Sequence, residues 1–132
     1  MTLLLSLAVG AAVTATAPPL LPETPDDGRD ERLDFPLDFA PDIDLEGYEE
    51  LRFAPGMFVA DSDSYFSYIL GIRLTERHEV DERFVSDFLL SYDRGLCAAV
   101  AGSRNLELDL ERVAVDLVPV SGDRYVATIE MY

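Results

Sequence analysis

The sequence predicts an α+β fold, a mostly antiparallel sheet of four to five strands with one long helix packed on one face. Residues 81–101 place their apolar side chains within one arc of an α-helix. The segments on either side alternate between apolar and polar residues, as half-buried strands do. This segregated order, together with the lack of a Gly-x-Gly-x-x-Gly motif or a phosphate loop, argues against a βαβ nucleotide-binding fold.

Composition narrows the class of partner. The 132 residues suffice for one small domain. A formal net charge of −16 argues against nucleic acid and anionic membrane surfaces as partners, because both require an excess of basic residues. All ten basic residues are Arg, which indicates either codon usage in a GC-rich bacterial genome or a halophile with a carboxylate-rich surface.

The first seventeen residues are typical of a signal peptide, which predicts a secreted protein in the periplasm or outside the cell. Leu3–Val13 is an apolar run too short to span a bilayer, and Ala15-Thr16-Ala17 is an A-x-A-like cleavage site. Cleavage after Ala15 avoids placing Pro18 directly after the cut. No basic residue precedes the apolar run, so an uncleaved anchor or a first helix is the alternative.

Residues 18–46 are predicted to be an acidic linker rich in Pro and Asp, with too little apolar surface to fold alone. Within it, residues 33–39 alternate apolar and polar, so this piece is expected to lie extended along the domain surface. Pro36 is compatible with an edge strand but not a central one. The compact domain is predicted to span residues 47–132.

Two strands are predicted before the helix. Leu51–Phe53 forms a short strand that ends at the turn Pro55-Gly56. Residues 65–75 give the strongest strand pattern, with Phe66 on the core face and Tyr65 on the opposite face.

The helix has predicted ends. Asp81 can cap the first turn, and Val80 and Val85 occupy the positions of a hydrophobic staple. Gly102 is expected to take the left-handed conformation that closes the helix.

Two further strands are predicted after the helix. Residues 106–110 alternate, and a parity shift at Arg112-Val113 predicts a bulge or turn. Residues 106–117 also fit a helix, but the β-branched run at Val113, Val115, Val118 and Val120 favours a strand for the later part. Ser121–Asp123 is a hairpin turn, and Tyr125–Tyr132 is the returning strand. Because the chain stops while this strand still alternates, we expect a truncated family member or a fragment.

Few residues offer catalytic chemistry. One His and one Cys cannot supply the usual structural zinc ligands within a monomer, and no G-x-S-x-G motif is present. The enzymatic alternative is a small carboxylate-dependent hydrolase that uses His78 near the Asp61–Tyr65 turn.

A calcium site is the other alternative, and no other cofactor is predicted. Asp42, Asp44 and Glu46 alternate before Gly47, and Ca²⁺ prefers clustered carboxylates. The EF-hand pattern is incomplete, because Phe53 stands where the bidentate acid is needed. Such a site would make the chain a calcium-stabilised structural module.

Two surfaces are candidates for binding. Tyr65, flanked by Ser67 and Arg73, is a candidate for a protein or glycan contact. An apolar stripe on the back of the helix is a candidate for self-association. It consists of Leu90, Cys97 and Ala101.

Residues 51–68 resemble a segment of exported bacterial proteins, and this resemblance implies export but no activity and no site residues. Together these observations favour an exported acidic binding or interaction domain of unknown ligand that is not an enzyme.

Overall fold

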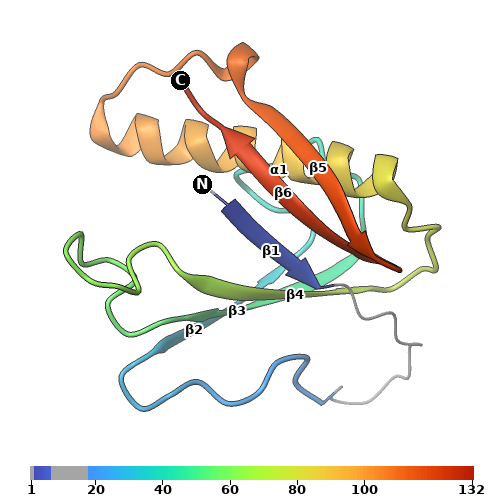
Figure 1. Ribbon diagram of the computed structural model, residues 1–132, viewed down its shortest axis with the longest axis horizontal. Helices are drawn as coiled ribbons and strands as arrows, with labels where there is room; N and C mark the ends of the chain where they lie inside the picture. The colour runs from blue at the N-terminus through green and yellow to red at the C-terminus, as the bar shows by residue number, and fades with distance from the viewer. Residues whose placement is uncertain (1, 7–17) are drawn as a thin grey trace. The chain divides into compact units, whose positions relative to one another are not determined.

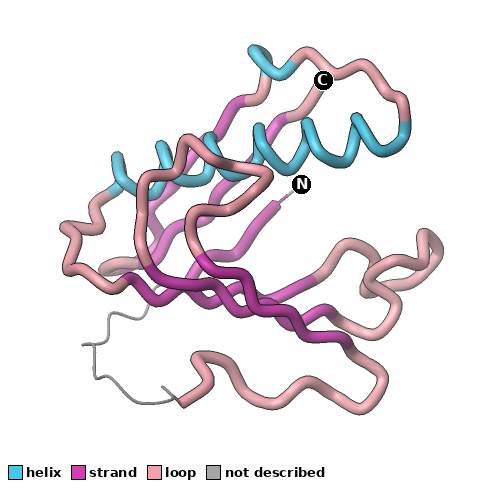
Figure 2. Tube along the Cα trace, turned by 180° about the vertical axis from the view of Figure 1, so that it is seen from behind, coloured by secondary structure: helices cyan, strands magenta, loops and turns pink. Residues whose placement is uncertain are grey.

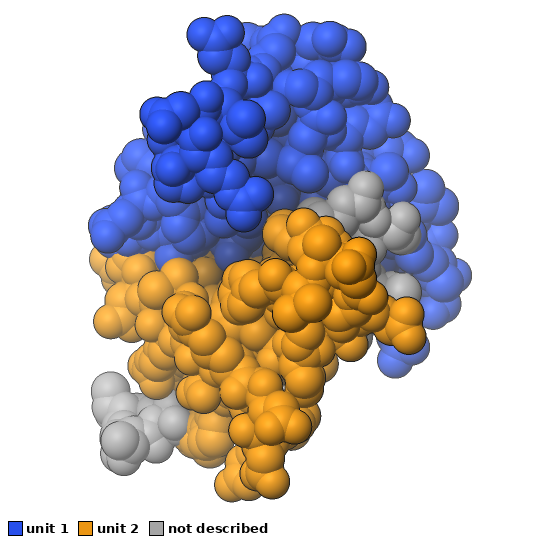
Figure 3. Space-filling model, turned by 90° about the vertical axis from the view of Figure 1, so that its left-hand side faces the viewer, with its two compact units in different colours: residues 1–9, 36–44, 78–132 blue, residues 10–35, 45–77 orange. Residues whose placement is uncertain are grey.

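The computed structural model describes residues 2–6 and 18–132, which form two compact units. One unit comprises residues 1–9, 36–44 and 78–132, and the other comprises residues 10–35 and 45–77 (Figure 3). The predicted α+β class is confirmed: the described residues form antiparallel strands, β1 to β6, and one long helix. The strands are divided between two sheets, a division that the sequence did not predict.

The first unit contains a three-stranded antiparallel sheet in which β6 (Arg124–Glu130) lies between β5 (Ala114–Ser121) and β1 (Thr2–Ser6). The β5–β6 hairpin turns at Gly122, whose φ of 55° suits glycine, so the predicted hairpin is confirmed. The expected signal segment contributes β1, and its remaining residues lie outside the described part of the chain.

Helix α1 (Glu82–Arg104) packs against β5 and runs beside the β5–β6 hairpin (Figure 1). Val85 and Leu89 form a core with Ala127, and the side chains of Val115 and Leu117 pack around it. The apolar arc of the helix therefore faces the sheet, as its periodicity predicts.

The start of α1 matches the sequence prediction, and its end does not. The Asp81 carboxylate accepts a hydrogen bond from the Phe84 amide at 2.8 Å, which confirms the predicted cap. Gly102 does not end the helix. Asn105 takes the left-handed conformation instead, with φ 53°, because asparagine tolerates this region and the apolar face continues to the buried Ala101.

The chain between α1 and β5 differs from the predicted strand. Residues 106–109 form a loop that leaves Leu106 and Leu108 exposed, because the structure gives them no neighbouring strand. A short 3-10 helix, η1 (Leu110–Arg112), follows at the predicted change of parity. Alternation alone does not make a strand when no described strand pairs with the segment, although the Leu106 and Asp109 amides find carbonyl partners elsewhere.

Residues 36–44 also belong to the first unit. Leu37, Ala40 and Ile43 are buried, and the Ala40 and Ile43 amides close two tight turns by donating to carbonyls three residues earlier. The Phe39 ring meets Tyr92 of α1 edge-on, with 5.0 Å between ring centroids. This part of the predicted linker is therefore packed into a core.

The second unit holds an antiparallel sheet with β3 (Gly47–Phe53) between β2 (Arg29–Asp34) and β4 (Tyr68–Leu74). The two strands predicted before the helix correspond to β3 and β4. Strand β3 is longer than predicted, and β4 is shorter. Strand β2 arises within the segment expected to be a linker, because β3 supplies a partner for its backbone. Natural edge strands commonly carry charged side chains, so the charged residues of β2 are compatible with its position at the edge.

Within the described part of the chain, no helix is both long and apolar enough to cross a membrane.

Candidate functional site

Residues 54–67 join β3 to β4 through a loop with its own hydrogen bonds (Figure 2, pink). The Ala54 amide donates to the Ser67 carbonyl at 3.1 Å and closes the base of the loop. The Phe66 amide donates to the carbonyl of the buried Met57 at 2.9 Å and links its two sides. These bonds give the loop a defined conformation with Met57 as its core.

Two backbone conformations shape this loop. Gly56 has φ +83° and leaves no room for a Cβ beside Ser62, whose hydroxyl accepts from the Ser64 amide at 3.1 Å. Phe66 has φ 55°, a conformation that costs a bulky residue about 1 kcal/mol or more. The surrounding hydrogen bonds hold this strained residue in place, and Phe66 is 41% exposed.

The loop presents an aromatic surface, which we define as Phe58, Val59, Tyr65 and Phe66. All four are exposed, with Phe58 at 67% and Tyr65 at 51%. The half-buried rings of Phe53 and Tyr68 connect its members, since neighbouring ring centroids lie between 5.7 and 6.2 Å apart. Monomeric proteins seldom expose so many large apolar side chains together without a binding role.

The structure brings together only part of the predicted binding set. Tyr65 and Ser67 are both exposed in the loop, close to the aromatic surface. Arg73 lies at the other end of β4, paired with Tyr48 of β3. The sequence pattern missed Phe66 as a surface residue, because its positive φ breaks the alternation before β4 begins.

The predicted calcium ligands are all exposed. Asp42, Asp44 and Glu46 lie in the chain before β3. Across residues 2–6 and 18–132, no three His, Cys, Asp or Glu side chains are grouped closely enough to hold a metal ion. Calcium binding at these positions stays a prediction without geometric support.

The residues of the hydrolase alternative are placed as follows. His78 is half-buried, with its ring centroid 5.8 Å from that of Phe84. Asp63 is exposed in the loop 54–67. Neither position adds support for catalysis, and this alternative also stays a prediction.

The predicted self-association stripe is largely covered within the chain. Cys97 and Ala101 are buried, and Leu90 is half-buried. The Cys97 thiol lies 2.9 Å from the Met131 sulfur. The prediction of self-association there consequently depends on Leu90 alone.

A buried acid lies one helical turn before this cysteine. Asp93 is 3% exposed, and its Oδ2 has no hydrogen-bond partner. Burial raises the pKa of Asp93 from 3.8 to about 6. Burial, and secondarily the charge of Asp93, raises the pKa of the Cys97 thiol, so this cysteine is a poor nucleophile.

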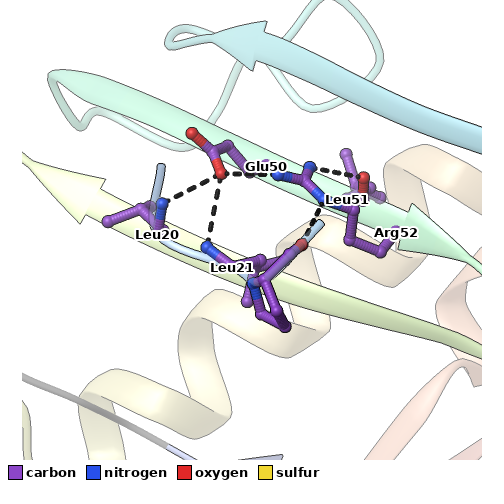
Figure 4. Close-up of polar contacts among 6 residues, drawn as sticks. Leu20, Leu21, Glu50, Leu51 and Arg52 are labelled. Carbon is purple, nitrogen blue, oxygen red and sulfur yellow. Dashed lines mark hydrogen bonds and ion pairs between the residues drawn. The ribbon is translucent and has the colours of Figure 1, made fainter. Parts of the chain in front are cut away.

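The second unit contains a buried carboxylate that holds a separate piece of chain (Figure 4). Oε2 of Glu50 accepts hydrogen bonds from the amides of Leu20 and Leu21, at 3.0 and 3.4 Å. Arg52 pairs with the same oxygen at 3.2 Å and donates through Nε to the Pro22 carbonyl at 3.0 Å. Sequence patterns gave no indication of this contact, because its two sides are 30 residues apart.

No protein-family model, curated protein or solved structure matches this chain. The contacts described above therefore carry the functional assignment. Among them, the aromatic surface is the feature most typical of a binding site.

Proposed function

We propose that this protein is an exported, non-enzymatic binding domain that recognises a protein partner through the aromatic surface of loop 54–67. The observation that carries the proposal is the exposure of Phe58, Tyr65 and Phe66 on a loop held by its own hydrogen bonds. Tyr and Phe are enriched at the centres of protein interfaces, where each contributes a large apolar area.

The ordered loop favours binding because little conformational entropy is left to lose. The bonds from Ala54 to Ser67 and from Phe66 to Met57 already fix the backbone before a partner arrives. The strained φ of Phe66 supports the same conclusion, since conformations of this kind gather at binding sites. Preorganised aromatic side chains raise affinity mainly by lowering the cost of association.

Charge indicates the chemistry of the partner. Asp61 and Asp63 are exposed on the same loop, and the whole chain carries a net charge of −16. A complementary surface would have an apolar centre and a rim of Arg or Lys. Such a rim speeds association at low salt and is screened at high salt.

Export supports a partner in the periplasm or outside the cell. This part of the proposal rests on the apolar run Leu3–Val13 and the small residues of Ala15–Ala17. The acidic composition agrees with a protein that stays soluble in that compartment.

The test compares partner capture by three forms of the immobilised full chain. These are the wild type, the Phe58→Ser/Tyr65→Ser double variant, and a control, Leu106→Ser/Val120→Ser, that removes two apolar side chains of 57% and 63% exposure elsewhere. Extracts of the cell envelope and medium supply the partners. We expect the wild type and the control to capture the same proteins, and the loop variant to lose them.

Salt and sugars provide the second part of the test. Captured proteins should elute as the salt concentration rises, because the charged rim is screened. Equal capture by the loop variant and the wild type would contradict the proposal. If the wild type binds an immobilised glycan and the Tyr65→Ser variant does not, the ligand of the aromatic surface is a glycan and not a protein.

A further inference from the structure

The second unit holds the short segment Leu20–Pro22 against its own sheet. Glu50 of β3 pairs directly with Gly71 of β4, so the two residues share one face of the sheet. A Cβ added to Gly71 would lie 3.2 Å from the Leu21 side chain and 3.3 Å from the Leu20 Cβ. The missing side chain of Gly71 thus leaves the space in which the two leucines lie.

The polar contacts of this site go to the backbone of the segment. Two successive amides, of Leu20 and Leu21, converge on one carboxylate oxygen of Glu50 (Figure 4). Successive backbone amides that converge in this way favour an anion, which here is a side-chain carboxylate. The guanidinium of Arg52 binds the carbonyl of Pro22. Such contacts recognise backbone shape, while the space at Gly71 selects for apolar side chains.

The site does not depend on the segment for charge balance. Glu50 is 5% exposed, and a buried carboxylate left alone would be costly. Its ion pair with Arg52 at 3.2 Å lies entirely within β3 and remains when Leu20–Pro22 leaves. Arg52 also donates to the Leu51 carbonyl at 3.1 Å, which orients its side chain. The empty site therefore keeps its binding groups in position.

The segment itself is suited to reversible docking. Cleavage after Ala15 or Ala17 would leave Leu20 within a few residues of the new N-terminus. The prolines at positions 18, 19 and 22 restrict the chain on both sides of the leucines, which lowers the entropy lost on docking.

We propose that the face formed by Glu50, Arg52 and Gly71 is a peptide-binding site, that Leu20–Pro22 is its resident pseudo-ligand, and that a Leu-Leu-Pro-type segment of another polypeptide displaces it. The ligand is a peptide with two adjacent apolar residues, whose amides bind the Glu50 carboxylate. The carbonyl of the next residue accepts a hydrogen bond from Arg52. This site goes beyond the aromatic surface and is independent of it.

Peptide binding to the full chain tests the site. The variant Leu20→Ser/Leu21→Ser weakens the resident segment and leaves the three site residues unchanged. The probe is a dye-labelled synthetic peptide of residues 18–24, PPLLPET, followed by fluorescence anisotropy. We expect the variant to bind it, and the wild type to bind it at least about tenfold more weakly, because its tethered segment competes. The peptide PPSSPET is the control and should not bind.

Substitutions in the site show where the peptide docks. Adding Gly71→Leu to the Leu20→Ser/Leu21→Ser variant should abolish binding by filling the space, and adding Glu50→Gln should weaken binding about tenfold. The unfolding transition of each variant shows whether it folds. If Gly71→Leu does not fold, the Glu50→Gln variant alone tests whether the peptide binds at this site. A folded variant that does not bind the peptide at millimolar concentration would overturn the proposal. Peptide binding that is unchanged by both Gly71→Leu and Glu50→Gln would also overturn the proposal.

Discussion

Gly95 of α1 lies against the backbone of Phe39 so closely that a Cβ on Gly95 would overlap the Phe39 carbonyl oxygen. The same Cβ would lie 2.9 Å from the carbonyl carbon and 3.0 Å from the Cβ of Ala40. Residues 36–44 therefore approach the helix at a position where it has no side chain. Gly102, on the same helix, has nothing within 4 Å of its added Cβ.

We predict that Gly95→Ala and Gly102→Ala change stability in opposite directions. In a helix interior alanine is favoured over glycine by about 1 kcal/mol, so Gly102→Ala should stabilise the fold by up to that amount. At Gly95 the overlap with backbone atoms should outweigh this gain, for a net loss of about 1–2 kcal/mol. Urea unfolding of both variants measures the difference. Stabilisation by Gly95→Ala would mean that residues 36–44 do not pack on α1.

Because Asp93 is buried, we expect the folded protein to lose stability as the pH rises. Its pKa is raised from 3.8 to about 6 by burial, so folding favours the protonated acid. Below pH 3.8 the acid is protonated in both states, and between pH 4 and 6 the unfolded chain ionises first. Above pH 6 the folded state is penalised by at most about 3 kcal/mol.

Asp93→Asn isolates this contribution from the other acids. We expect the variant to be more stable than the wild type at pH 7.5, with the difference shrinking towards pH 4, as measured by thermal unfolding across this range. Asp87, which is exposed on the same helix, provides the matched control, and Asp87→Asn should not reproduce the gain in stability at pH 7.5. Parallel pH profiles for wild type and Asp93→Asn would show that Asp93 ionises normally.

Cys97 should react slowly with thiol reagents in the folded protein. The side chain is buried, and burial together with Asp93 raises its pKa, so little thiolate is present or accessible at pH 8. Reaction with a colorimetric disulfide reagent should accelerate by orders of magnitude when the chain is unfolded in guanidinium. Asp93→Asn should increase the native rate modestly by removing the neighbouring charge. A native rate equal to the unfolded rate would contradict the buried position.

The N-terminus of the exported protein is a further prediction. Intact-mass analysis of protein recovered from its natural compartment should place it at Thr16 or Pro18, after cleavage by signal peptidase. Cleavage at either position removes β1, so Arg124–Thr128 of β6 would keep β5 and lose one of their two neighbouring strands. Recovery of the chain with Thr2–Ser6 intact would instead make β1 a lasting part of the fold.

Local sequence patterns predicted the elements whose causes are local. The apolar arc and the Asp81 cap marked the helix to within a few residues, and Gly122 marked the hairpin turn. The strongest alternation identified β4, although the strand begins three residues later than predicted. For the candidate site, the sequence indicated Tyr65 and Ser67 but not their neighbours Phe58 and Phe66.

Elements that depend on distant partners could not be predicted in this way. Residues 29–34 have the composition of an acidic linker and form a strand because β3 pairs with them. Residues 106–110 alternate like a strand, but no strand in the described part of the chain pairs with them. The contact of Glu50 with Leu20 joins positions 30 residues apart. Periodicity describes which conformation a segment tolerates, whereas pairing and burial depend on what the rest of the chain brings to it.

The sequence by itself therefore determined the α+β class, the helix and its cap, and the acidic character of the chain. Three features depend on the tertiary structure: the division of the strands into two sheets, the aromatic surface, and the packing of Leu20–Pro22 against Gly71. The physical reason is the range of the interactions. Capping and periodicity act within a few residues, while backbone pairing and the filling of a space require segments that only folding brings together.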